Sequence, residues 1–152
     1  MYITTSRKPS DTTRRLARTI ANFIGIYENR GKKTIEDVVT RADELGENRV
    51  MIISQSGGNP NSLSFISVDG EWGWLEPEII FSVKLPLTKI RRLGNQKEYQ
   101  GDKKYSNLFD FHEPDTDDVV SVKMNDKIIS FVYKKLNLEL KIKELRKLII
   151  ED

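Results

Sequence analysis

The sequence predicts an α/β fold of the α+β type, in which two similar α/β halves share one mixed β-sheet. Two stretches with helical periodicity lie near the N-terminus, and short apolar segments typical of strands follow them. A strand, a turn-rich loop and a hairpin recur in each half, as in SFISVDGEWGWL and VSVKMNDKIISFVY. This repeated order is what a degenerate duplication would leave.

The length of 152 residues suits a single domain, which two small α/β halves could build around a shared core. We assign residues 1–93 to an N-terminal half and residues 107–152 to a C-terminal half. Residues 94–106 (GNQKEYQGDKKYS) are polar and aperiodic, so we expect an exposed, mobile connection between the halves.

The N-terminal half begins with a predicted strand at residues 2–5, before the turn at Arg7-Lys8-Pro9. A helix follows at residues 11–27, capped by Ser10 or Asp11. Its apolar residues recur at helical spacing and therefore share one broad face, made of Leu16, Ala17, Ile20, Phe23 and Ile24.

A second helix begins after Thr34, which opens a Thr-x-x-Asp pattern similar to a capping box, and ends at Gly46. The apolar run in residues 49–54 predicts a central strand that is covered on both faces. Residues 55–61 (QSGGNPN) are predicted to form a loop. Its glycines invite comparison with a phosphate-binding loop, but the spacing Gly-x-x-x-x-Gly-Lys-Ser/Thr is missing.

A hairpin is predicted around Asp69-Gly70, with strands at residues 63–68 and 71–75. Trp72 and Trp74 alternate along the second strand, so both rings should lie on one face of it. An aromatic pair of this kind belongs to the core more often than it forms a stacking platform, so we expect both rings in the core.

We expect Pro77 to break the chain before a strand at residues 79–85, and one or two helical turns at residues 87–93. The C-terminal half is predicted to contain, in order, strands at residues 107–111, 119–124, 127–133 and 136–142 and a helix at residues 144–150. The strands at 119–124 and 127–133 form a second hairpin about Asn125-Asp126, and helical spacing competes with the strand pattern in the last stretch.

The composition excludes several classes of function. The absence of cysteine excludes disulfides, zinc ribbons, thiol catalysis and iron–sulfur clusters, and fits a cytoplasmic protein. No apolar run approaches the ~20 residues of a membrane span. His112, the only histidine, lies in the acidic loop 112–118, where a metal or acid–base site competes with a simple solvated turn. We expect no enzyme, no cofactor or metal, and no small-molecule substrate.

Charge is segregated along the chain. The first 33 residues carry eight basic and two acidic side chains, a net charge of +6, whereas the residues after them carry 17 basic and 21 acidic side chains, a net charge of −4. A concentrated basic region attracts polyanions, and the mildly acidic remainder limits nonspecific binding elsewhere.

Arginines gather on one side of the first predicted helix. At 100° per residue, Arg14, Arg15 and Arg18 fall opposite the apolar face. The planar guanidinium group donates paired hydrogen bonds that suit a phosphate. The alternative is a solvated helix surface in which arginine serves its helix propensity.

Several motifs resemble the Brix domain. In chain order they are Ile3-Thr4-Thr5-Ser6-Arg7, TRRLARTIA, Asn29-Arg30-Gly31-Lys32, Gly58-Asn59-Pro60, Leu63-Ser64-Phe65, Phe111-His112 and Ile129-Ser130-Phe131. The resemblance spans essentially the whole chain and is to the short, single-domain archaeal members. It implies a ribosome-assembly factor that binds ribosomal RNA and protein partners. It also implies that each half resembles the anticodon-binding domain of class II aminoacyl-tRNA synthetases.

We therefore predict a noncatalytic protein that binds precursor ribosomal RNA, with ribosomal or assembly proteins as further partners. The alternative is a protein-interaction scaffold whose basic face binds an acidic assembly partner. The expected RNA-binding residues are Arg7, Lys8, Arg14, Arg15, Arg18, Arg30, Lys32 and Lys33. Weaker candidates are Arg91, Arg92, Arg146 and Lys147. Many Brix proteins carry a Gly-Pro-Arg-like segment implicated in RNA contact near the C-terminus, where this chain instead reads Lys143-Glu144-Leu145-Arg146-Lys147.

Overall fold

The computed structural model describes residues 1–87 and 89–147, and confirms the mixed α+β class. A single nine-stranded sheet has the order β2-β1-β3-β4-β5-β9-β8-β7-β6. The helices are α1 (Asp11–Ile24), α2 (Ile35–Glu44) and the 3-10 helix η1 (Lys103–Leu108). The strands are β1 (Tyr2–Thr5), β2 (Ile26–Tyr27), β3 (Arg49–Ser56), β4 (Asn59–Ser67), β5 (Gly73–Val83), β6 (Gln96–Tyr99), β7 (Val119–Met124), β8 (Ile128–Tyr133) and β9 (Leu136–Arg146).

The pairing pattern is the same on both sides of the β5–β9 pair. On one side β1 is parallel to β3, and β3, β4 and β5 are antiparallel neighbours. On the other side β6 is parallel to β7, and β7, β8 and β9 are antiparallel neighbours. The antiparallel pair β5–β9 joins the two sets, and the short strand β2 forms an edge beside β1.

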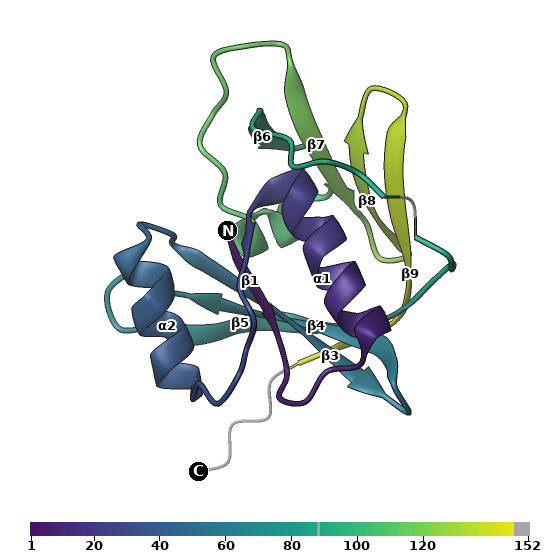
Figure 1. Ribbon diagram of the computed structural model, residues 1–152. Helices are drawn as coiled ribbons and strands as arrows, with labels where there is room; N and C mark the ends of the chain where they lie inside the picture. The colour runs from purple at the N-terminus through teal and green to yellow at the C-terminus, as the bar shows by residue number, and fades with distance from the viewer. Residues whose placement is uncertain (88, 148–152) are drawn as a thin grey trace.

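The two helices cover opposite faces of the sheet. Ile3 packs in the same cluster as the apolar face of α1, whereas its neighbour Tyr2 packs with α2. Because successive side chains of a strand point to opposite faces, this alternation places α1 and α2 on different sides. In β3, residues 49–53 are all buried, as predicted for a strand covered on both faces. Figure 1 shows α1 in the curve of the sheet, with β8 beside it.

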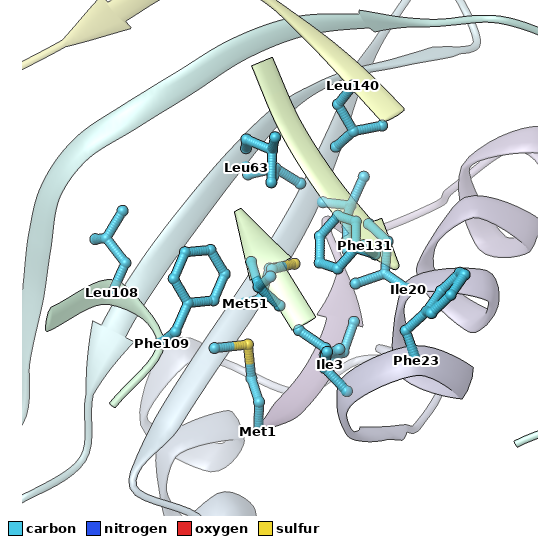
Figure 2. Packing of buried hydrophobic residues seen from close by; sticks show 14 of the residues in the cluster. Met1, Ile3, Ile20, Phe23, Met51, Leu63, Leu108, Phe109, Phe131 and Leu140 are labelled. Atoms are coloured by element: carbon cyan, nitrogen blue, oxygen red, sulfur yellow. The ribbon is translucent and has the colours of Figure 1, made fainter. Parts of the chain in front are cut away.

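The larger core lies between α1 and the curved sheet (Figure 2). Phe23 of α1 contacts Phe131 of β8, with ring centroids 6.1 Å apart. Phe65 of β4 meets Phe109, the residue after η1, edge to face at 5.6 Å. One core therefore joins α1, both sets of strands and η1. Because the apolar side of α1 is held in this core, the opposite side of the helix faces outward.

Several predicted boundaries in the N-terminal half were wrong. Residues 55–61 do not form a loop throughout, because β3 extends to Ser56 and β4 begins at Asn59. Helix α1 stops at Ile24, where Gly25 leaves the helical conformation (φ −169°, ψ −148°). The Gly25 backbone lies so close to Met1, the residue before β1, that a Cβ atom would be 2.1 Å from the Met1 carbonyl oxygen. Residues 26–27 then form β2. Pro77 does not break the chain but lies inside β5, at a shift in register opposite β4 where its missing N–H group is tolerated.

The predictions for residues 87–111 were also wrong. No helix forms among the described residues of 87–93, where Ile90 and Leu93 instead bond to Asn22 of α1. Residues 94–106 contain β6 and the start of η1, so they are not an unstructured connection. Residues 107–111 form no strand. At the other end of the chain, residues 144–146 continue β9, and the rest of the predicted helix, 148–150, lies outside the described residues.

Candidate nucleic-acid interface

Seven basic residues form what we call the basic surface. They come from the turn before α1, the outward side of α1 and the loop after the edge strand β2, and are Arg7, Lys8, Arg14, Arg15, Arg18, Lys32 and Lys33. Of the eight residues predicted to bind RNA, only Arg30 is buried, and it is excluded from this set.

Helix α1 has the amphipathic arrangement that the sequence predicts. Leu16 and Ile20 are fully buried, whereas Arg15 and Arg18 are exposed and Arg14 is partly exposed. Arg14 and Arg18 are four residues apart and therefore lie on the same side of the helix. Burial raises the pKa of Tyr27 at the end of β2, and the charges of Arg18 and Arg14 oppose this rise. Both guanidinium groups therefore lie near the start of the loop that follows β2.

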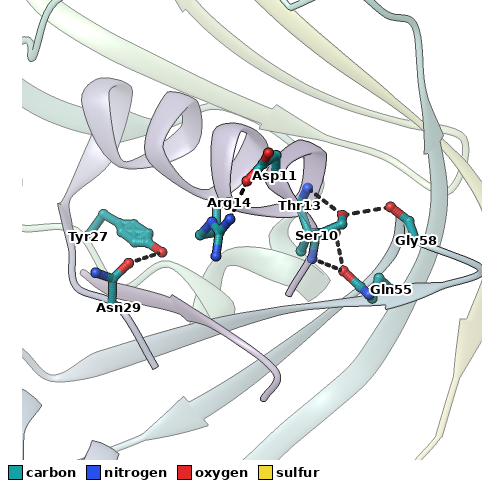
Figure 3. A network of polar contacts seen from close by, with 8 residues as sticks. All are labelled: Ser10, Asp11, Thr13, Arg14, Tyr27, Asn29, Gln55 and Gly58. Carbon is teal, nitrogen blue, oxygen red and sulfur yellow. Dashed lines mark hydrogen bonds and ion pairs between the residues drawn. The ribbon is translucent and has the colours of Figure 1, made fainter. Parts of the chain in front are cut away.

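The N-terminal end of α1 is fixed by the turn between β3 and β4 (Figure 3). The Ser10 Oγ atom accepts a hydrogen bond from the Thr13 backbone N–H at 3.2 Å and donates one to the Gly58 carbonyl oxygen at 2.6 Å. Gln55 Oε1 accepts from the Ser10 N–H at 2.7 Å and from the Thr13 hydroxyl at 2.8 Å. The QSGGNPN segment thus caps a helix and cradles no phosphate.

One arginine of the helix is paired. Arg14 donates to Asp11, three residues earlier, and this hydrogen bond holds the pKa of the Asp11 carboxyl below its usual value. Such a pair between exposed side chains contributes little to stability and is readily exchanged for a stronger anion. Arg15 and Arg18 form no ion pair with any carboxylate among the described residues.

A shallow depression lies between α1 and the loop after β2. The Arg18 guanidinium carbon is 5.2 Å from the centre of the Tyr27 ring. The Tyr27 hydroxyl donates to Asn29 Oδ1 at 2.8 Å, and Lys33 Nζ donates to the Asn29 carbonyl oxygen at 3.0 Å. Glu28 and Arg41 complete the lining. The depression therefore presents cations beside a half-exposed aromatic ring.

The acid in this depression is neutralised. Arg41 of α2 donates two hydrogen bonds of 2.9 Å to the Glu28 carboxylate, and the Tyr2 hydroxyl donates a third at 3.0 Å. The hydrogen bonds from Arg41 lower the pKa of Glu28. Glu28 therefore stays ionised but paired, so it repels an approaching anion weakly.

Arg30 has a structural position. It is 7% exposed, and its guanidinium group donates to the carbonyl oxygens of Lys33 at 2.8 Å and Thr5 at 3.1 Å. Burial lowers the pKa of this group. These bonds tie the loop 28–33 to the end of β1 and so position Lys32 and Lys33. No signal in the sequence indicates this, because Arg30 stands in a polar, glycine-containing stretch like its exposed neighbours.

The weaker candidates lie elsewhere. Arg91 and Arg92 are exposed beside the C-terminal end of α1, since Asn22 bonds to Ile90 and Leu93. Arg146 is paired with Glu144 at 3.0 Å on β9, and Lys147 follows it, exposed. The structure does not join these residues to the basic surface through any contact within the described ranges.

The two tryptophans and the single histidine, which were the other candidate site residues, all lie at least partly exposed. Trp72 and Trp74 are 37% and 40% exposed, so the prediction that favoured the core was wrong. His112 is exposed in its acidic loop. Within residues 1–87 and 89–147, no three His, Asp or Glu side chains gather as metal ligands, and no helix is long and apolar enough to span a membrane.

The fold and the basic surface together define an α+β domain with one arginine-lined face. Known proteins are similar to this chain in both sequence and fold. The chain is 38% identical over 88 residues to a "Probable Brix domain-containing ribosomal biogenesis protein" of Thermococcus kodakarensis, a match covering 56% of this chain and 42% of the relative. A protein of the same description from Methanococcus maripaludis is 31% identical over 111 residues, covering 72% and 60%. No protein-family model matches the chain.

Two crystal structures share the fold. A probable ribosomal biogenesis protein from Aeropyrum pernix gives a TM-score of 0.71 at 20% identity, covering 96% of this chain and 98% of that one. Mil, an archaeal Imp4-like protein, gives 0.68 at 24%, covering 96% and 99%. The chain is thus a homologue of archaeal Brix domain-containing proteins, which confirms the predicted resemblance. The matches span about two fifths of the length of the first of these relatives.

Proposed function

We propose that this protein is a noncatalytic factor of ribosome biogenesis that binds precursor ribosomal RNA in the cytoplasm through the basic surface. One observation carries the proposal: Arg18 of α1 and Lys33 of the neighbouring loop line one depression, and the Glu28 carboxylate in its lining is already paired with Arg41. The names of the curated relatives support the link to ribosome biogenesis.

The contacts would be made mainly to phosphates, which position a protein on RNA without specifying sequence. Any recognition of sequence would come from an unpaired base stacked on an exposed ring or guanidinium plane. The depression lined by Arg18 and Tyr27 is the part of the basic surface that offers both.

The proposal predicts a specific salt dependence. Replacing Arg14, Arg15 and Arg18 together by Gln should weaken binding to a ribosomal RNA fragment in a filter-binding titration. The slope of log Kd against log salt should fall by roughly 0.7 to 0.9 for each phosphate that the variant no longer neutralises. The matched control replaces three exposed lysines of the β7–β9 region, Lys123, Lys127 and Lys143, by Gln. An unchanged slope in the arginine variant, with its fold intact, would refute the proposal.

The second candidate is a scaffold whose basic surface receives an acidic segment of an assembly partner. The same surface serves both functions, so competition must separate them. We expect ribosomal RNA to bind, excess tRNA to compete poorly, and polyglutamate to compete only at low salt. Polyglutamate binding without any binding of ribosomal RNA would favour the scaffold.

We also propose that the chain consists of two related halves that meet at the β5–β9 pair, each similar to the anticodon-binding domain of class II aminoacyl-tRNA synthetases. The equivalent pairing patterns of β1–β3–β4–β5 and β6–β7–β8–β9 support it. On this proposal, β6 belongs to the C-terminal half and corresponds to β1. A search of the C-terminal half alone against anticodon-binding domains should then align β7–β9 with their strands.

A further inference from the structure

On the face of the sheet opposite α1, the helix that covers the β1–β3 region is acidic. Helix α2, which covers that face, carries four acidic residues and one basic residue, namely Glu36, Asp37, Asp43 and Glu44 against Arg41. Arg41 is itself bound to Glu28 and Glu44. A polyanion is therefore repelled from this side of the molecule, and a polycation is attracted.

Two exposed tryptophans lie on the same face. Trp74 pairs across the sheet with Ile66, which packs in the core beneath α2. Directly paired residues of an antiparallel ladder point to the same face, so the Trp74 ring lies on the α2 side. Trp72 lines a depression with Val39 of α2 and Val68, at the C-terminal end of this helix. Apart from Leu85, these are the exposed large apolar side chains of the described residues.

The surroundings of Trp72 are acidic. The depression beside it includes Asp43, Glu47 and Asp69, and none of the described residues that line it is Lys or Arg. Glu47 pairs with the N-terminal ammonium group at 2.7 Å, and Asp69 pairs with Arg49 at 3.3 Å, although Arg49 is only 5% exposed and lies beneath the surface. Asp43 forms no ion pair within the described ranges.

We propose that this face is a docking site for a Lys- and Arg-rich segment of a partner protein. We call it the tryptophan–acid surface and define it by Asp43, Asp69, Glu71, Trp72 and Trp74. A cationic side chain over an indole ring gains an attraction that a purely apolar peptide lacks, and indole is the strongest partner for this interaction. The acidic side chains add complementary charge at the same place. The proposal uses the face opposite the basic surface and does not depend on RNA binding.

The protein carries its own reporter for this site. Trp72 and Trp74 are the only two tryptophans, so the intrinsic tryptophan fluorescence of the full chain reports on the tryptophan–acid surface alone. We expect titration with an octa-arginine peptide to change the fluorescence saturably. Octa-glutamate and oligouridine RNA should leave it unchanged. The Arg14, Arg15 and Arg18 triple variant should respond to octa-arginine like the wild type.

Two variants locate the binding. Trp74→Leu keeps an apolar side chain and leaves Trp72 as reporter, and it should weaken octa-arginine binding by about two- to fivefold because one cation–π interaction is removed. The double variant Asp43→Asn with Glu71→Gln should weaken it further. The matched control removes two charges from the exposed acidic loop, by Glu113→Gln with Asp117→Asn, and should bind like the wild type.

Three outcomes would overturn the proposal. The first is the absence of any saturable response to octa-arginine, or an equal weakening in the acidic-loop control. The second is a fluorescence response to oligouridine that persists in the arginine triple variant, which would make the tryptophans an RNA platform. The third is self-association of the free chain by light scattering that Trp74→Leu abolishes, because the occupant would then be the basic surface of a second copy.

Discussion

Burial decides what each arginine of this chain does. Arg15 and Arg18 leave their guanidinium groups in solvent. Arg30 and Arg49 bury theirs and donate to protein acceptors, as when Arg49 donates to the Asn107 carbonyl oxygen at 2.8 Å and so ties β3 to η1. Arg30 stands in the same polar, glycine-containing stretch as the exposed Lys32, so residue type and local pattern cannot separate the two roles there. The separation needs the tertiary contacts.

This difference predicts that the same substitution changes the free energy of unfolding much more at a buried arginine than at an exposed one. Arg30→Gln should lower the free energy of unfolding by about 1–3 kcal/mol, because the buried carbonyl oxygen of Thr5 loses its bond from Arg30 and the partly buried carbonyl oxygen of Lys33 loses one donor. Arg15→Gln, on the exposed side of α1, should change it by less than about 0.5 kcal/mol. Urea unfolding followed by circular dichroism measures both. Equal losses of stability in the two variants would contradict the structural role of Arg30.

The tryptophans show a related limit at the residue scale. Their spacing predicts that both rings share one face of a strand. Trp74 lies in β5 on the same face as Ile66, whereas Trp72 precedes the strand and lines the depression beside α2. Whether that face is covered depends on how far α2 extends across the sheet. Helix α2 ends at Glu44, and both rings remain partly exposed. The sequence pattern carries no information on that extent.

At the scale of elements, patterns within a few residues of sequence were sufficient to predict helix caps, helix periodicity and hairpins. The capping box of Thr34 with Asp37, the apolar periodicity of α1 and α2, and the hairpins at Asp69-Gly70 and Asn125-Asp126 were all correctly predicted. Strand β6 was missed because QKEY has no strand-like pattern, and only its parallel pairing with β7, about 20 residues away, makes it a strand.

The docking of α1 also rests on a contact that is distant in sequence. Ser10→Ala removes both the helix cap and the bond to Gly58, so it should cost about 1–2 kcal/mol in the free energy of unfolding. Thr12→Ala, in the same turn but outside this network, serves as the control and should cost much less. Thermal or urea unfolding of the two variants provides the comparison, and an equal destabilisation of both would show that the cap contributes nothing specific.

At the scale of the whole molecule, the sheet separates two helices of opposite charge. Helix α1 presents Arg14, Arg15 and Arg18 on one side, and the acidic α2 covers the other. The concentration of positive charge in the first 33 residues was visible in the sequence. That the acidic remainder gathers partly on the opposite face was not, because the positions of helices across a sheet follow from topology.

RNA is expected to bind on the α1 side of the molecule. Ultraviolet crosslinking of the protein to a precursor ribosomal RNA transcript, followed by mass spectrometry of the crosslinked peptides, tests this most directly. We predict crosslinks in residues 6–18 and 27–33, with few in α2 or the β4–β5 hairpin. Crosslinks concentrated on α2, the hairpin or the stretch around Arg91 and Arg92, with none on α1, would contradict RNA binding through the basic surface.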